Sequence, residues 1–385
     1  MLNKSFPSSQ WFHQLFGFEE SLQNVKKYLS VSTNNSGLLE LVSSQNNRRF
    51  LPGNLEITNT KSLLASITNH LNRNPKTKLN HGTLNIIHGL DSDTNLNMMQ
   101  YVDVMACCSH SQFNGCTVQV ASNFNCLEFV NQNQKKFDGV TDYALNGTQG
   151  PSASLSCASS LVFRNYFYEN SHFSNSTNHS NRHIINDKEI NLLIKTPLSV
   201  KHGKVLIQTK SEVERLKSSQ FNWSDKNNYY VGHHRNCEVC LERDLKHPDH
   251  FSMLHNKKQF VNQVFCSAFN FSENVIFNSF TTTIAQHIMN SMYESTILAA
   301  ILNHLEHPEL PGSNKCFLTL LGGGVFGNPR EIIAPAIVRN LELISKSGLD
   351  VNIMLYSDDI FANYLPLLED SMRRTGGKVI IVGQS

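Results

Sequence analysis

One short stretch, CFLTLLGGGVFGNPR at 316–330, limits the possible folds of this chain more than any other. It runs an apolar strand into a glycine-rich turn and then into the start of a helix. Glycines in such a turn can adopt positive φ and let the backbone approach a ligand closely. The free amides of the following helix face the turn, which suits an anion such as phosphate. The residues expected to contact the anion are Gly322, Gly323, Gly324, Val325, Phe326, Gly327 and Asn328.

The start of this helix can also be read from the sequence. Asn328 is expected to cap it, with Pro329 at its first position and Glu331 completing a capping box. The turn should therefore have a fixed geometry.

Other interpretations of the glycine turn must be weighed. A P-loop is excluded because no Lys-Ser or Lys-Thr pair follows the glycines. A dinucleotide fingerprint remains open, since Gly322, Gly324 and Gly327 satisfy G-x-G-x-x-G and a second strand, 351–356, ends at Asp358 and Asp359, where a ribose-binding acid would stand. This alternative would make the chain an NAD-dependent oxidoreductase, although the acid lies farther downstream than the usual distance of about 20 residues. A structural alternative is that the glycines only connect a strand to a helix.

The letters GGGVFGNP, followed by EIIAPAIVRNLELI and LDVNIMLYSDD, resemble the closing half of a macrodomain. In that family a G-V-F-G-x-P turn holds the phosphates of ADP-ribose, and the aromatic residue of the turn lines the distal ribose. The resemblance therefore implies that ADP-ribose is the ligand, that the turn at 322–327 holds its phosphates, and that Phe326 lies beside the sugar. It implies no other cofactor.

An upstream segment resembles the other half of the same pocket. The strand 117–121 ends in Ser122, Asn123 and Asn125, which is similar to the family's N-A-A-N strand ending, whose last Asn holds the proximal ribose. The resemblance gives this role to Asn123, or to Asn125 if the register differs by two.

The family's first glycine-rich turn would correspond to NGTQGP at 146–151. In that case Thr148, Gln149 and Gly150 would face phosphate at a second helix amino terminus. The alternative is a plain turn before a proline-started helix.

Three acidic residues, Glu128, Asp138 and Asp142, lie between the expected ribose asparagine and this second turn. Hydrolysis of an ADP-ribosyl bond passes through a cationic ribose, so a nearby carboxylate could stabilise charge or activate water. We expect Asp138 first and Asp142 second to act with Asn123 in catalysis, because FDGVTDY is turn-like and would face a cleft. The alternative is that each is a solvated turn acid.

Four segments, TQGP, RNYF, QVFCSA and LTLLGGGVFGN, resemble a divergent macrodomain group. That group includes bacterial effectors that remove ADP-ribose from arginine on ubiquitin. The resemblance implies a hydrolase acting on an ADP-ribosylated protein, with ubiquitin arginine as one candidate substrate. Asn146 stands where an acid is expected before the TQGP turn, so a non-catalytic ADP-ribose reader is kept as an alternative.

Histidines and cysteines are densest around 233–255. Cys237 and Cys240 with His233 and His250 could form a tetrahedral zinc site. However, the chain has 17 histidines and only one Cys-x-x-Cys pair in this region, so we expect no metal.

Strands and helices alternate from Tyr101 onward, which predicts an α/β fold. We expect a mixed central sheet flanked by helices in three layers, as in a macrodomain. Residues 1–95 are expected to form an N-terminal accessory region. Residues 96–385 are expected to form the main domain, with polar insertions near 170–185 and 222–250. Strands are expected at 102–106 and 190–194, among others.

Composition limits the partners. A formal net charge of +2 without a block of like charge argues against nucleic acid. No segment resembles a signal peptide or a bilayer span, so we expect no membrane partner and a cytoplasmic location. The nine cysteines lie mostly in apolar segments, as reduced buried thiols do.

Overall fold

The computed structural model describes residues 5–89, 103–129, 133–168, 189–244, 246–254 and 258–382. Its centre is an eight-stranded sheet in the order β16-β6-β15-β14-β7-β13-β10-β5. The strands are β5 (Asn54–Asn59), β6 (Thr83–Gly89), β7 (Thr117–Ala121), β10 (Tyr230–Glu238), β13 (Phe260–Cys266), β14 (Lys315–Leu318), β15 (Asp350–Leu355) and β16 (Val379–Val382). The strands from β16 to β13 are all parallel, whereas β10 runs antiparallel to both β13 and β5. The expected mixed central sheet is confirmed.

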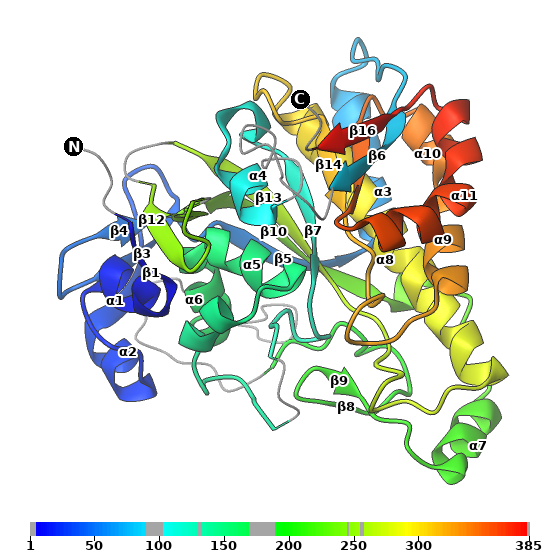
Figure 1. Ribbon diagram of the computed structural model, residues 1–385, viewed down its shortest axis with the longest axis horizontal. Coiled ribbons are helices and arrows are strands. Elements are labelled where there is room, and N and C mark those ends of the chain that lie inside the picture. Colours follow the sequence, from blue (N-terminus) through cyan, green and yellow to red (C-terminus); the bar gives the residue numbers. More distant parts are fainter. Residues whose placement is uncertain are drawn as a thin grey trace.

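Helices cover both faces of this sheet (Figure 1). On one face α4, α5 and α6 pack together, and α5 and α6 contact β7 and β10. On the other face α3, α8, α9 and α11 contact one another in a row, and α10 lies against β6. Their bounds are α3 (Thr60–Arg73), α4 (Val104–Ser109), α5 (Gln149–Ser156), α6 (Ala158–Tyr166), α8 (Ser279–Glu306), α9 (Arg330–Val338), α10 (Leu341–Ser345) and α11 (Asp358–Arg374). The expected flanking helix layers are confirmed.

Helix α8 illustrates how the sequence specifies these layers. Asn278 caps its start by accepting hydrogen bonds from the amides of Phe280 and Thr281. Ile284, Ile288 and Met292 recur every four residues and are fully buried, which gives the helix its apolar stripe.

The connections that leave β7 and β14 go to opposite faces of the sheet. The chain leaves β7 for α5 and leaves β14 for α9, and these two strands are neighbours. They pair only at Thr117 with Cys316 and at Val118 with Phe317, so their carboxyl ends diverge. This is a topological switch point, where open α/β sheets bind their ligands.

Smaller elements surround the central sheet. One three-stranded sheet joins β2, β3 and β4, another joins β1, β12 and β11, and β8 and β9 form a hairpin. Their bounds, with those of the remaining helices, are β1 (Phe6–Pro7), α1 (Trp11–Phe16), α2 (Leu22–Tyr28), β2 (Leu29–Thr33), β3 (Leu39–Ser43), β4 (Arg49–Phe50), η4 (Thr141–Leu145), β8 (Val200–Lys201), β9 (Lys204–Val205), α7 (Lys210–Ser218), β11 (Leu241–Arg243) and β12 (His250–Met253).

The N-terminal elements hold the segment that leads into α5. The carboxylate of Glu20 accepts hydrogen bonds from the amides of Val140 and Thr141, from the Thr141 hydroxyl and from the hydroxyl of Tyr166. The indole of Trp11 donates to the carbonyl of Thr141 over 3.0 Å. Residues far apart in the sequence thus fix one short helix, η4, in front of α5.

Some expectations need correction. Strands β5 and β6 fall within residues 1–95 yet belong to the central sheet, whereas β1 to β4 lie outside it. The expected insertion at 222–250 contains the central strand β10, whose neighbours pair with it on both sides. The other expected insertion, 170–185, falls outside the described residues.

Two short elements also differ from expectation. Residues 102–106 were expected as a strand, but α4 begins at Val104 because the Asp103 carboxylate caps it, accepting from the amides of Met105 and Ala106. The segment 190–194 forms turns.

All nine cysteines lie in the described residues, and each is buried and free of a disulfide. Within the same residues, no helix has the length and apolar character that crossing a bilayer requires.

Replacement of Glu20 by alanine should lower the free energy of unfolding by about 2–3 kcal/mol, because several donors lose a charged acceptor. Urea denaturation measures this change. The matched control is Glu19→Ala, since the neighbouring Glu19 side chain is 83% exposed and pairs only with His13; it should change stability by less than about 0.5 kcal/mol. Equal losses in the two variants would contradict the structural role of Glu20.

Candidate functional site

The glycine turn lies at the carboxyl end of β14, beside the switch point. Gly322 has a φ of 71° and Gly327 a φ of 65°, both in the left-handed region that favours glycine. The amide of Asn328 donates to the carbonyl of Gly322 over 2.9 Å and closes the turn. A Cβ on Gly322 would lie 2.7 Å from the Cβ of Ala268, so the turn is packed tightly against the end of β13.

Asn328 has a different role from the expected one. Its side-chain amide donates to the carbonyls of Phe269 and Gly322, at 2.7 and 3.2 Å, and its side chain is buried. Helix α9 begins at Arg330 after Pro329, without a side-chain cap. The expected cap at Asn328 is therefore wrong, because its side chain instead fastens the turn to the segment after β13.

The turn presents three consecutive amides toward solvent. The amides of Gly323 and Gly327 donate inside the turn, to the carbonyls of Leu320 and Gly324. In the described part of the chain, the amides at 324–326 donate to no acceptor. Gly324 is exposed, with no neighbouring atom within 4 Å of an added Cβ, and Val325 is 63% exposed. Successive free amides of this kind attract an anion.

The second expected turn lies across the switch point, at the start of α5. Thr148 is the N-cap residue, and its amide donates to Asn146 Oδ1 over 3.1 Å. A Cβ on Gly150 would collide with the carbonyl oxygen of Ala121, so α5 starts directly against the end of β7. Among the described residues, the amides of Gln149 and Gly150 have no acceptor.

Gln149 was expected to face a phosphate at the helix start. Its side chain bonds to β7, so only its backbone amide, which has no acceptor in the described residues, is free to do so. Its Oε1 accepts from the amide of Ala121 over 3.0 Å, and its Nε2 donates to the carbonyl of Gln119 over 2.7 Å. These are the two groups that β14 would bond if it continued alongside β7. Gln149 thus occupies the gap between the diverging strands.

Asn123 and Asn125 follow β7 as expected, but both are buried beneath the hairpin β8–β9. The amide of Phe124 donates to the carbonyl of Gly203 over 2.7 Å, and a Cβ on Gly203 would lie 2.5 Å from Asn125 Cγ. Asn123 Nδ2 donates to the carbonyl of Phe129, whereas Asn125 Nδ2 has no partner among the described residues. Asn125 therefore keeps one unused donor next to the end of β7.

The two acids expected to be catalytic are both exposed. Asp138 Oδ2 accepts from the amide of Lys135 over 2.9 Å, as a turn acid does. Asp142 lies in η4, directly before the start of α5. Their catalytic role stays a prediction.

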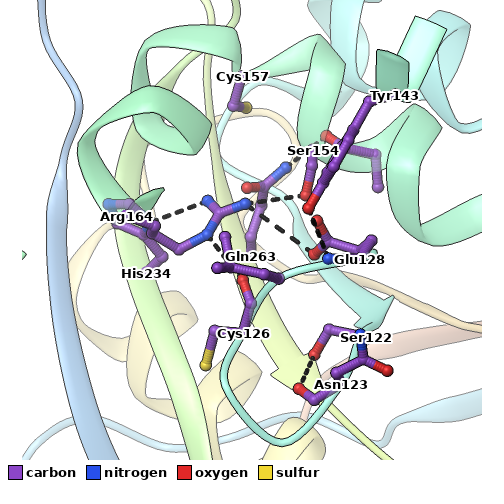
Figure 2. A network of polar contacts seen from close by, with 12 residues as sticks. Ser122, Asn123, Cys126, Glu128, Tyr143, Ser154, Cys157, Arg164, His234 and Gln263 are labelled. Carbon is purple, nitrogen blue, oxygen red and sulfur yellow. Dashed lines mark hydrogen bonds and ion pairs between the residues drawn. The ribbon is translucent and has the colours of Figure 1, made fainter. Parts of the chain in front are cut away.

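Glu128, the third acid, lies in a buried polar network that Figure 2 shows. Its amide donates to the hydroxyl of Tyr143 over 2.6 Å, and its Oε1 lies 4.0 Å from Arg164 Nη2. Neither carboxylate oxygen has a hydrogen-bond partner in the described residues. Burial raises the pKa of Glu128 to about 7, although the charge of Arg164 opposes this shift.

Arg164 is the cation of this network and is itself fully buried. Its Nε donates to the carbonyl of Cys126 over 3.1 Å, and its Nη2 donates to Ser154 Oγ over 2.9 Å. The guanidinium lies 3.9 Å from the ring centre of Phe265, a cation–π contact. Sequence reasoning did not identify Arg164; the one available signal was a cation within the apolar segment LVFRNYF.

The zinc interpretation is not supported. His233 and His234 are consecutive residues of β10 and point to opposite faces of the sheet. The side chain of His250, the first residue of β12, bonds to that of Asp249. Across the residues that the structure describes, no three His, Cys, Asp or Glu side chains are placed to hold a metal ion.

One of the two acids of the dinucleotide alternative, Asp358, is bonded to a histidine, whereas the other, Asp359, is exposed. Asp358 Oδ1 bonds to His88 Nε2 over 2.8 Å and stands at the start of α11. The fingerprint would need one of these two carboxylates for a sugar hydroxyl.

Together these features define a mixed α/β protein with a glycine turn at the switch point of its sheet, three amides of which have no acceptor in the described residues. No protein-family model matches the chain, and no curated protein matches it. Similar solved structures include a mutant poly(ADP-ribose) glycohydrolase from Deinococcus radiodurans in complex with ADP-ribose, with 10% identity and a TM-score of 0.41 over 82% of this chain and 94% of that one.

Two structures of poly(ADP-ribose) glycohydrolase from Thermomonospora curvata are also similar, each with 10% identity over 92% of this chain and 98% of the other. A mutant has a TM-score of 0.39, and the enzyme bound to the inhibitor ADP-HPD has a TM-score of 0.38. Likenesses with TM-scores below 0.5 do not transfer a ligand or a reaction to this chain.

Two glycines of the turn should respond differently to alanine. Gly322→Ala should lower the free energy of unfolding by about 1–3 kcal/mol, because the new Cβ meets Ala268 and Asn328 at a positive φ. Gly324→Ala should change it by less than about 0.5 kcal/mol, because its Cβ would point into open space. Urea denaturation of both variants checks this, and similar losses would contradict the described geometry.

Proposed function

We propose that this chain is a macrodomain-like protein that binds ADP-ribose at the switch point and hydrolyses it from a modified protein. The observation that carries the proposal is the run of three amides at 324–326 that have no acceptor among the described residues. A diphosphate offers several anionic oxygens in one place, which such amides can bind without a basic side chain. The resemblance of GGGVFGNP to the phosphate-holding turn of macrodomains favours ADP-ribose over other diphosphate ligands.

The start of α5 supplies the second half of the proposed diphosphate site. The free amides of Gln149 and Gly150 lie beside the end of β7, and those of the turn follow β14, the neighbouring strand. Both groups stand at the carboxyl edge of the sheet, and both precede a helix whose positive dipole end faces this edge. A diphosphate between them would meet partial positive charge from two sides.

The two sugars would extend from this diphosphate in different directions. We assign the proximal ribose to Asn123 or Asn125, the two side chains that follow β7. Gly203 covers both of them, so the hairpin tip must shift before that sugar can bind. Phe326, half-buried in the turn, would contact the distal ribose.

We assign the hydrolytic step to Asp138 or Asp142. Each is an exposed carboxylate in the segment that leads to α5, and each could activate water or stabilise the cationic ribose. ADP-ribosylated arginine on ubiquitin is the first substrate to test.

A non-catalytic reader is the second candidate, and Asn146 favours it. This residue stands where an acid was expected, and its Oδ1 accepts from both the amide and the hydroxyl of Thr148. It therefore serves the turn and brings no carboxylate to the site.

Removing one amide of the turn should weaken ADP-ribose binding. Val325→Pro deletes the central N–H, and because a hydrogen bond to a charged group is worth about 1.5–3 kcal/mol, the Kd should rise about 10- to 100-fold. Val325→Ala keeps the amide while losing the same exposed side chain, so it should bind like the wild type. Isothermal titration calorimetry measures both variants, with urea denaturation to confirm folding. Equal affinity in both variants would count against the amide site.

Turnover can be separated from binding with ADP-ribosylated ubiquitin. The wild type should release ADP-ribose, and Asp138→Asn or Asp142→Asn should slow release at least about 100-fold with binding retained. Chromatography of released ADP-ribose measures the rate, and the exposed Glu19→Ala variant is the control. Binding without release by the wild type would select the reader, and preference for NADH over ADP-ribose would select the oxidoreductase.

A further inference from the structure

Glu128 is a buried carboxyl group for which the proposed reaction has no role. Its side chain is 2% exposed and touches the first turn of α5: a Cβ on Gly150 would lie 3.1 Å from Glu128 Cγ. Neither of its oxygens has a hydrogen-bond partner among the described residues. A buried carboxyl group with Arg164 as its close cation therefore lies behind the helix end whose amides we assign to the diphosphate.

The elements packed around Glu128 contribute few charges. Arg164 of α6 is the cation at 4.0 Å, and four further contacts engage its guanidinium, with Cys126, Ser154, His234 and the Phe265 ring. Further titratable groups are the Tyr143 hydroxyl of η4, the Cys126 thiol, and His234 of β10, whose Nδ1 lies 3.4 Å from Arg164 Nη1.

Burial has raised the pKa of the thiol and of the hydroxyl, so both stay neutral at physiological pH. The charge of Glu128 can change in that range, since burial raises its pKa to about 7.

Two anions would then share one helix end. Ionised Glu128 lies on the inner side of the first turn of α5, and a diphosphate at the free amides of Gln149 and Gly150 would lie on the outer side. A helix amino terminus favours negative charge, but two anions this close repel each other through a poorly screened interior. Protonation of Glu128 removes that repulsion.

We propose that Glu128 takes up a proton when a diphosphate ligand binds, so that this buried carboxyl group couples ligand affinity to pH. The inference rests on the proposed function for the position of the diphosphate. The direction of the pH dependence follows from linkage. A ligand that favours the protonated carboxyl group raises the pKa of that group in the complex, so the affinity for the ligand falls as pH rises through 7. If the pKa rises by one unit in the complex, binding at high pH is about tenfold weaker than at low pH.

Calorimetric titration with ADP-ribose at pH 7, in two buffers of different ionisation enthalpy, measures the protons taken up. The diphosphate of ADP-ribose does not titrate near neutral pH, so the uptake belongs to the protein. The wild type should take up roughly 0.4 proton per ligand for a one-unit rise in pKa, and uptake should decline toward both pH 5 and pH 9. Glu128→Gln, which keeps the shape without the titration, should bind with no uptake and with a flat pH profile.

The control is His202→Gln. His202 is the histidine of the hairpin over Asn125 and lies 3.7 Å from Glu189, so this variant tests whether a histidine beside the proposed ribose site accounts for the proton uptake. This variant should keep the uptake, and loss of uptake in it would overturn the assignment to Glu128.

Two further outcomes would overturn the inference and can be told apart. Wild-type binding without proton uptake would refute the coupling while leaving the proposed function intact. Absence of any binding heat would refute the proposed function and the coupling together. If Glu128→Gln does not fold, the wild-type profile decides: uptake centred near pH 7 supports Glu128, and uptake without a decline toward pH 9 refutes it.

Discussion

The divergence of β7 from β14 is the constraint on which the candidate site depends. Two neighbouring parallel strands can part only if the backbone groups they leave behind find other partners. Gln149 provides them, because its side-chain amide bonds the amide of Ala121 and the carbonyl of Gln119 as an adjoining strand would. The side chain of Gln149 thereby allows β7 and β14 to diverge, and it fixes the start of α5 between them.

The rest of the molecule holds this opening in place from outside the sheet. Glu20, from the N-terminal elements, anchors η4 through backbone and side-chain donors, and η4 leads directly into α5. Asn328 fastens the glycine turn to the segment after β13. The free amides on the two sides of the switch point are thus presented by segments that Glu20 and Asn328 fasten to the rest of the molecule.

The sequence allowed the sheet and the glycine turn to be predicted, because both depend on local patterns. Apolar runs such as 117–121 and 351–355 are typical of buried parallel strands, and the glycines mark a turn. Strand β10 was missed because its polar residues resemble a loop, yet β13 and β5 satisfy its backbone from both sides. The side-chain contacts of Gln149 and Glu128 could not be predicted for a related reason: they depend on partners, β7 and Arg164, that only the fold brings to them.

The nine buried cysteines have a consequence for how motions of this protein can be followed. A thiol in the interior reacts with an alkylating reagent only while its surroundings are open. These thiols lie in α4, directly before β7 and in the loop after it, at the junction of α5 with α6, in strands β10, β13 and β14, and between β10 and β11. The order in which the cysteines become labelled therefore ranks how readily these elements open. Labelling of Cys126, which is next to Asn125, would report when the hairpin β8–β9 moves away from Asn125.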